Sequence, residues 1–386
     1  MQPSLWIVFE RGFLFWLLGL LFLNAPALAE INPKHTRDLK LLWEYSSNGA
    51  INQAPIIRRN IVLTAPSGLA LLALNLENGQ VIWKFNPQAG IWDRAFAADQ
   101  NSVYAGTRNA ELSAIDLESG KLRWNAKLGF QLQVRPLIHE GVVYAATTQV
   151  GPGLPMRPER KARLFAFNAE DGTLLWSYET LYYALQTPSI SGDTIFIGGS
   201  YYDPEQDIDE GGPMAIQARN VKDGVLKWTY FGVEGFIKTI YAAANEVAFV
   251  GYQDFVTALD TQSGKRLWRK DTGNWVPALS GNKSMLYYGS ANTIVHAQRM
   301  GDGARIWQYN IPWGSFNYIL GEPFVTVDKL VFLTQRGNVL ALKLESGELL
   351  WSAATDIRSR TGLTLSGNTI VMGDDQGGIR AYQLPE

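Results

Sequence analysis

The stretch that decides the fold is Leu112–Trp124, which reads LSAIDLESGKLRW. Its first residues alternate as in a β-strand, and Asp116 followed by Gly120 marks a turn, because glycine readily adopts positive φ. The residues after the turn favour a second strand, which ends in Trp124. The stretch therefore predicts a β-hairpin that carries one tryptophan on its second strand.

The same pattern occurs six more times along the chain. In every copy a glycine stands four residues before the tryptophan, and this agreement among seven separate segments identifies an internal repeat. The other copies are Leu72–Trp83, Leu164–Trp176, Ile216–Trp228, Val256–Trp268, Val295–Trp307 and Val339–Trp351.

A further pair of strands is expected upstream of each hairpin, for example at Ser102–Thr107, Gly141–Thr147, Thr194–Ser200 and Met285–Ser290. Four strands in a unit of about forty residues form the blade of a β-propeller. Each tryptophan brings a large apolar surface and an N–H group that needs a partner. We expect it to dock each blade onto the next.

The two ends of the chain decide the number of blades. Lys40–Trp43 has a tryptophan strand without the preceding half-motif, and Gly377–Leu384 has the half-motif without a tryptophan. The N-terminal strand is expected to pair with the C-terminal half-motif and so remove the open sheet edges. The prediction is an all-β, eight-bladed β-propeller of four-stranded antiparallel blades. The alternative is a seven-bladed ring with one irregular extra strand.

The N-terminus has the features of an export signal. Arg11 precedes a short apolar run at Gly12–Leu23, and Ala27–Ala29 supplies the small residues of a cleavage site. We expect a signal peptide at residues 1–29, a propeller domain at residues 30–386, and a periplasmic or otherwise exported protein. An uncleaved N-terminal anchor is the alternative. No later stretch approaches membrane-spanning length.

Composition excludes several classes of site. The sequence contains no cysteine, which excludes disulfides, thiolate metal sites, a cysteine nucleophile and acylation of an N-terminal cysteine. The formal net charge of −2 gives no general electrostatic reason to bind nucleic acid or an anionic membrane. Because a closed ring has no open edge to cover, we expect a monomer.

Catalytic signatures are weak. The three histidines fall far apart in the repeat, and each fits a surface or strand position better than a catalytic base; they are His35, His139 and His296. The acidic residues Asp171 and Asp223 belong to the hairpin turns, whose backbone they suit. No catalytic residue is predicted.

Two repeat units are longer than the rest. Trp124 to Trp176 and Trp176 to Trp228 each span 52 residues, and both extra segments fall between the second and third strands. The first insertion is basic (Arg157, Arg160, Lys161, Arg163) and the second is acidic (Asp203, Glu205, Asp207, Asp209). These loops either pair with each other or form a docking surface for a protein partner. A calcium site at Asp203–Glu210 is a further alternative.

A ring of residues is expected where the innermost strands begin. Alignment on a recurrent proline gives Gln53, Arg94, Val134, Gln186, Lys238, Trp275, Gly321 and Arg360. The cations, amide and indole of this ring suit an anion or an aromatic acid at one mouth of the channel. The candidate ligand site is Arg94, Gln186, Lys238, Trp275 and Arg360. The alternative is a hydrated mouth that polar side chains simply fill.

The repeats resemble those of the PQQ-repeat propellers, whose motif is Ala-x-Asp-x-x-Thr-Gly-x-x-x-Trp. The best matches are Ala114–Trp124 and Ala258–Trp268, and the resemblance covers the chain beyond the signal. In size it is most similar to the BamB family of outer-membrane assembly factors. The resemblance implies a non-catalytic interaction scaffold with protein partners in the cell envelope and no cofactor. Members of that family are typically lipoproteins, whereas this chain has no cysteine to acylate.

The same repeat also occurs in quinoprotein dehydrogenases. That resemblance implies, as the alternative, an enzyme that binds PQQ with calcium or a periplasmic propeller that binds a small anion. Such dehydrogenases generally carry an adjacent-cysteine disulfide and a calcium-binding Glu/Asn/Asp set. The cysteines are absent here, and the set has no counterpart in the sequence.

Overall fold

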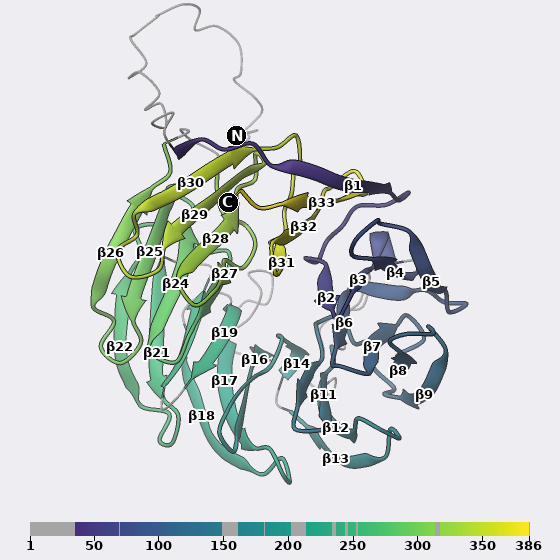
Figure 1. The fold of residues 1–386 in the computed structure, drawn as a ribbon. Helices are drawn as coiled ribbons and strands as arrows, with labels where there is room; N and C mark the ends of the chain where they lie inside the picture. Colours follow the sequence, from purple (N-terminus) through teal and green to yellow (C-terminus); the bar gives the residue numbers. More distant parts are fainter. Residues whose placement is uncertain are drawn as a thin grey trace, which may run out of the picture.

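A computed structural model describes residues 35–68, 70–148, 161–180, 182–201, 214–233, 237–243, 246–251, 254–312 and 317–385. The described strands form eight antiparallel sheets, which follow one another around a common centre (Figure 1). Seven sheets are each built from one continuous segment, and the eighth combines both ends of the described chain. We number these sheets as blades 1–8 along the chain.

The strands of blades 1–4 have the following bounds. Blade 1 has β2 (Ile56–Arg58), β3 (Ile61–Thr64), β4 (Leu71–Asn75) and β5 (Val81–Phe85), with a short 3₁₀ segment at Pro66–Gly68; blade 2 has β6 (Ile91–Ala98), β7 (Ser102–Thr107), β8 (Glu111–Asp116) and β9 (Leu122–Lys127). Blade 3 has β10 (Leu137–His139), β11 (Val142–Ala146), β12 (Arg163–Asn168) and β13 (Leu174–Glu179); blade 4 has β14 (Tyr182–Leu185), β15 (Ser189–Ser191), β16 (Thr194–Tyr201), β17 (Met214–Asn220) and β18 (Leu226–Val233).

Blades 5–8 continue the series. Blade 5 has β19 (Ile237–Ala243), β20 (Glu246–Gly251), β21 (Phe255–Asp260) and β22 (Arg266–Asp271); blade 6 has β23 (Leu279–Gly281), β24 (Met285–Ser290), β25 (Ile294–Arg299) and β26 (Arg305–Asn310). Blade 7 has β27 (Phe324–Val325), β28 (Lys329–Leu333), β29 (Asn338–Lys343) and β30 (Leu349–Ala354); blade 8 has β1 (Lys40–Ser46), β31 (Thr364–Ser366), β32 (Thr369–Gly373) and β33 (Gly378–Gln383).

The prediction of four strands in every blade is wrong for blade 4, which forms a five-stranded sheet. Its strand β16 is long enough to pair with β15 along its first half and with β14 along its second half. Pro188 lies between the two short strands and has no N–H to donate, so the inner edge of this blade is interrupted there.

The ring is closed by the pairing of the N-terminal strand β1 with the C-terminal strand β33, as the two half-motifs predicted. In the register of this pair Trp43 lies opposite Ala381 and Tyr45 lies opposite Ile379. Beyond the strands, the amide of Ser47 donates to the carbonyl of Gly377 over 2.9 Å. Blade 8 is therefore held together by residues that are far apart in the sequence.

Arg380 of β33 adds an ionic tie to this closure. Its guanidinium lies 2.8 Å from Oε1 of Glu44 on β1 and 3.0 Å from Oδ2 of Asp374 in the β32–β33 turn. Asp356, in the connection that leads into blade 8, lies 3.9 Å away. Arg380 and Asp374 are both largely buried, with 15% and 9% of their side chains exposed. One arginine thus joins three segments of the composite blade.

Neighbouring blades are joined by the tryptophans of their outer strands. The indole Nε1–H of Trp307 in blade 6, for example, donates to the carbonyl of Leu344 in blade 7 over 2.9 Å. Equivalent bonds run from Trp43 to Leu76, Trp83 to Leu117, Trp124 to Ala169, Trp176 to Val221, Trp228 to Thr261 and Trp268 to Met300. The expected docking of each blade onto the next is confirmed for these seven tryptophans.

The motif glycines receive these indole rings. All seven have φ between 66° and 76°, the left-handed region that side chains with a Cβ rarely adopt. In blade 7 a Cβ on Gly347 would lie 2.6 Å from the ring of Trp307. The glycine is thus needed both for the turn and for the space that the neighbouring tryptophan occupies.

Within the described ranges, none of the helical segments has the length and apolar character required to cross a membrane.

Replacement of Gly347 by alanine tests the double role of the motif glycine. The Gly347→Ala protein should lose about 3 kcal/mol of unfolding free energy, because backbone strain and overpacking against Trp307 add together. Gly141→Ala is the matched control, since Gly141 has a similar φ of 75° but open space around its Cβ position. It should lose only about 1 kcal/mol. Urea unfolding of both variants measures the difference, and equal losses would contradict the packing role.

Replacement of Arg380 by methionine tests the ionic tie of the closure. The Arg380→Met protein should lose about 3 kcal/mol, because Asp374 is left largely buried without its cation. Arg299→Met is the control: Arg299 also contacts an aspartate, but that pair is about half exposed and should contribute less than about 1 kcal/mol. A similar decrease of the urea midpoint in both variants would show that the ion pairs of Arg380 contribute no more than an exposed surface ion pair.

Candidate functional site

Two sets of connections lie on the same face of the ring. Because the strands of a blade run alternately up and down, the connection into the innermost strand and the connection between the second and third strands share one face. We call it the loop face. It carries both predicted insertions, which fall between β11 and β12 in blade 3 and between β16 and β17 in blade 4. The innermost strands also begin on this face, where the ring of candidate channel-mouth residues was predicted; of these, Arg94 and Lys238 lie within β6 and β19.

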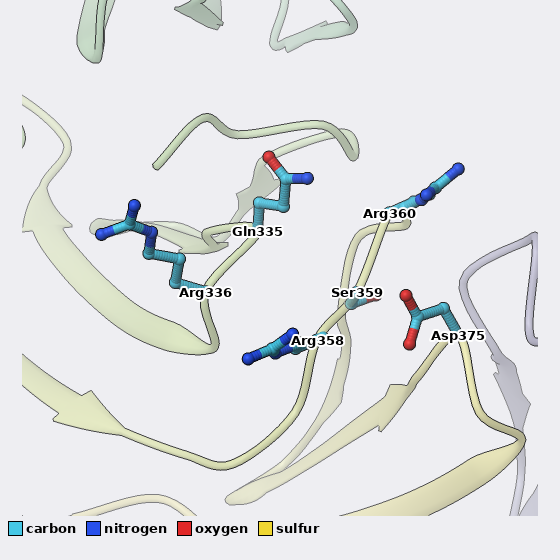
Figure 2. Close-up of a pocket in the computed structure, with 6 residues that line it drawn as sticks. All are labelled: Gln335, Arg336, Arg358, Ser359, Arg360 and Asp375. Carbon is cyan, nitrogen blue, oxygen red and sulfur yellow. The ribbon is translucent and has the colours of Figure 1, made fainter. Parts of the chain in front are cut away.

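The loop face contains a pocket of about 690 Å³ between blades 7 and 8. We call it the arginine pocket. Figure 2 shows its lining: Gln335 and Arg336 from the β28–β29 connection, Arg358, Ser359 and Arg360 from the β30–β31 connection, and Asp375 from the β32–β33 connection.

Backbone hydrogen bonds fix the loops of the arginine pocket. The amide of Asp375 donates to the carbonyl of Arg358 over 3.1 Å, which ties two lining connections together. The amide of Gln335 donates to the carbonyl of Tyr318 over 2.8 Å, and the amide of Arg336 donates to Oδ1 of Asn317 over 3.2 Å. The arginines therefore extend from a backbone whose path is set by its own hydrogen bonds.

The charge of the pocket lining is unbalanced. Arg336, Arg358 and Arg360 are exposed, and among the described residues no carboxylate forms an ion pair with any of them within 4.0 Å. Asp375 is the single acidic residue of the lining, and its Oδ1 accepts a hydrogen bond from the side chain of Gln376 over 3.2 Å. The lining thus presents three guanidinium groups against one carboxylate, an arrangement suited to an incoming anion.

The structure brings only part of the predicted channel-mouth site together. Arg360 lines the arginine pocket. Trp275 does not line the pocket but makes an edge-to-face contact with Tyr318, with ring centroids 6.4 Å apart. The backbone carbonyl of Tyr318 accepts a hydrogen bond from the amide of Gln335 in the lining. The aromatic pair is thus linked to the pocket through the backbone of Tyr318.

The other predicted members of the site do not line the pocket. Arg94 is exposed in blade 2, and Gln186 is partly exposed in blade 4. The side chain of Lys238 lies outside the described residues, although its backbone belongs to β19. The alignment placed one residue from every blade in a ring, and in a ring of blades such positions are spread around the circumference rather than gathered at one point.

Two further ring positions have structural roles. Gln53 is buried, and its Nε2 donates to the carbonyl of Phe96 in the next blade over 3.1 Å. At Gly321 a Cβ would lie 1.9 Å from the amide nitrogen of Gly362, so the entry loops of blades 7 and 8 touch backbone to backbone. This close approach, rather than a ligand, requires the glycine.

Sequence reasoning missed Arg336 and Arg358. Arg336 belongs to a short β28–β29 connection that has no insertion, and Arg358 lies two residues before the aligned position of Arg360. The Arg-x-Arg pattern at 358–360 was the signal available. Only the contact between blades 7 and 8 reveals that Arg336 lines the same pocket as Arg358 and Arg360.

The basic insertion is anchored to its own blade at its C-terminal end. Nζ of Lys161 and Nη2 of Arg163 lie 3.6 Å and 3.5 Å from the carboxylate of Glu179 on β13. The remaining predicted loop residues lie outside the described part of the chain: Arg157, Arg160, Asp203, Glu205, Asp207 and Asp209. The proposed calcium site at Asp203–Glu210 lies outside it as well.

The three histidines stand in separate surroundings. His35 contacts the carbonyl of Leu350 and His139 lies 3.8 Å from Glu140, whereas His296 is buried on β25. Nε2 of His296 lies 2.9 Å from Oγ of Ser290. Among the residues that the structure describes, no three His, Cys, Asp or Glu side chains are grouped so as to hold a metal ion.

The family model described as outer membrane protein assembly factor BamB matches this chain at residues 70–231 and 211–385. The two matches together cover most of the chain. The chain belongs to the BamB family. BamB of Yersinia pestis is 24% identical over 320 residues, which cover 77% of this chain and 76% of that protein.

Solved structures agree with the propeller fold, and relatives that share the repeats include dehydrogenases. The crystal structure of BamB from Moraxella catarrhalis matches with a TM-score of 0.66 and 17% identity, covering 90% of this chain and all of that one. The dehydrogenase subunit of a quinone-dependent alcohol dehydrogenase from Gluconobacter oxydans is 27% identical over 62% of this chain. The matched region is 35% of that enzyme, so the likeness to it concerns the repeats of one part.

Burial of His296 in this BamB-family chain should make its stability depend on pH. Burial, and secondarily the nearby Arg305, lowers the pKa of His296 to about 4. Between pH 6.5 and about 4 the unfolded chain therefore binds a proton there that the folded chain does not, and the free energy of unfolding falls as the pH falls. The full loss from this group is about 3 kcal/mol.

His296→Gln keeps a polar side chain at this position and removes the titration. Urea unfolding between pH 7 and pH 4 should show a weaker pH dependence for the variant than for the wild type. Parallel curves would show that His296 does not control acid stability in this range. His139→Gln is the control for the substitution itself, because His139 is partly exposed rather than buried.

Proposed function

We propose that this protein is an exported, non-catalytic interaction scaffold of the BamB type, which holds a protein partner of outer-membrane protein assembly. The observation that carries the proposal is the pair of insertions in the adjacent blades 3 and 4. Both insertions connect the second and third strands of their blades, whose linked ends lie on one face of a closed ring. Membership of the BamB family over residues 70–385 supports it. The expected location is the cell envelope, after export directed by residues 1–29.

The ring suits such a role because it fixes the positions of its loops. Seven indole bonds between blades and the closure by β1 and β33 leave little freedom in the framework. Recognition in proteins concentrates on irregular loops held by a rigid scaffold. The opposite charges of the two insertions would steer a partner that carries both signs.

The partner-binding role of the first insertion is tested by charge reversal. Arg157→Glu, Arg160→Glu and Lys161→Glu combined should reduce capture of outer-membrane assembly components from detergent-solubilised envelopes by at least tenfold. The thermal midpoint should stay within a few degrees, because the contact of Lys161 with Glu179 is half exposed. Recovered proteins are identified by mass spectrometry.

The matched control reverses three exposed arginines of outer strands, Arg123, Arg266 and Arg305. These residues lie at the first or second position of strands β9, β22 and β26, on the face opposite the loops, and their reversal should leave capture unchanged. Two results would overturn the scaffold proposal. One is recovery of no assembly component by the wild type, and the other is equal loss in the two triple variants.

The dehydrogenase alternative requires a site for PQQ and calcium. The arginine pocket offers guanidinium groups for the carboxylates of PQQ, but its lining contains the single carboxylate of Asp375. That lining does not fit a calcium ion that needs several oxygen ligands. Calorimetric titration of the protein with PQQ, with and without calcium, tests the alternative directly, and a calcium-dependent heat of binding would favour an enzyme.

A further inference from the structure

We infer that the arginine pocket binds an extended acidic peptide segment of the protein partner, with side-chain carboxylates placed on Arg336, Arg358 and Arg360. The inference rests on the scaffold function proposed above. It assigns a second contact to the loop face, at blades 7 and 8, on the part of the ring away from the insertions of blades 3 and 4 (Figure 1).

The chemistry of the lining favours carboxylates. Guanidinium groups donate paired N–H bonds to a carboxylate, and such charge-assisted bonds are stronger than neutral ones. None of the three arginines has a carboxylate partner within 4.0 Å in the described structure, so an incoming acid displaces no internal ion pair. The carboxylate of Asp375 repels an incoming acid. The lining therefore has a net positive charge but includes one negative group.

Three acidic residues of blade 8 and of the connection leading into it are already engaged. Glu44, Asp356 and Asp374 surround Arg380 at 2.8–3.9 Å. Asp374 also accepts hydrogen bonds from the amides of Gln376 and Gly378. The closure of blade 8 thus holds these carboxylates on one arginine and leaves the pocket arginines to a ligand. The negative charges of these three residues also weaken the positive electrostatic potential around the pocket. Binding of an acidic ligand therefore depends on direct contact with the arginines.

The layout of the guanidinium groups favours an extended ligand over a single small anion. Arg336 and Arg358 extend to one side of the lining loops, and Arg360 extends to the other (Figure 2). One small anion cannot contact groups that point apart, whereas successive side chains of an extended segment can. A volume of about 690 Å³ is also far larger than one carboxylate needs.

Asn317 supports Arg336 as a positioning residue. Its side chain is fully buried, and its Oδ1 accepts the amide of Arg336. Among the described residues its Nδ2 has no hydrogen-bond partner, a cost that the bond to Arg336 helps to offset. The β28–β29 connection is thereby held against the entry loop of blade 7.

Fluorescence anisotropy with fluorescein-labelled hexaglutamate tests the inference on the full mature protein. The wild type should bind this peptide and should not bind labelled hexaglutamine. The variant Arg336→Gln/Arg358→Gln/Arg360→Gln should bind at least tenfold more weakly. The control Arg123→Gln/Arg266→Gln/Arg305→Gln removes the same charge from the opposite face and should bind within twofold of the wild type.

The variant Asp375→Asn provides a second test, whose expected result is tighter binding and so cannot come from a folding defect. Removal of the single lining carboxylate should tighten hexaglutamate binding severalfold, because a repulsion is lost while the arginines stay. Citrate competition distinguishes the two sources of carboxylate. Displacement of the peptide only at a large excess of citrate supports a peptide site, and binding of citrate more tightly than hexaglutamate would overturn it in favour of a small-anion site.

The outcomes separate this inference from the scaffold proposal. Capture of assembly components that is unchanged in the three-glutamine pocket variant, together with equal hexaglutamate binding, would overturn the pocket inference and leave the scaffold standing. Failure of the wild type to capture any component would overturn the scaffold, whereas selective hexaglutamate binding by the same sample would still support an acidic-peptide site.

Discussion

The indole N–H of one blade donates to a backbone carbonyl of the next, and the ring of that tryptophan lies against the glycine of the same turn. This contact joins two sheets that share no strand pairing, so the propeller depends on it. Trp351 of blade 7 differs, because blade 8 has no hairpin turn between β33 and β1; it packs instead near Ile370 and Tyr382. The junction of blades 7 and 8 is therefore built differently from the others.

The candidate site lies at the same junction of blades 7 and 8, on the loop face. Elsewhere a repeated hairpin supplies the contact between blades, whereas at this junction the entry loops meet backbone to backbone at Gly321 and Gly362. The arginine pocket lies in the same region, lined by the connections of these two blades. The lining is supplied by three connections of blades 7 and 8, and none of its residues comes from the N-terminal strand β1.

Much of the framework could be predicted from sequence because the repeat constrains it locally. The glycine of each turn and the tryptophan four residues later predicted the hairpin. The two half-motifs predicted the pairing of β1 with β33. The split inner edge of blade 4 was not predicted, since it depends on the length of β16 and on Pro188. Of the four candidate channel-mouth residues whose side chains are described, only Arg360 lines the pocket, because equivalent positions in successive blades are spread around the ring.

The distribution of charge at this junction follows from burial. Arg380 is largely buried and must be compensated, so it gathers Glu44, Asp356 and Asp374. The exposed arginines of the pocket remain solvated and need no internal partner. The same few loops thus contain one ionic cluster that stabilises the closed ring and one set of cations that is open to a ligand. Stability and recognition can then change independently, because the residues that serve each are different.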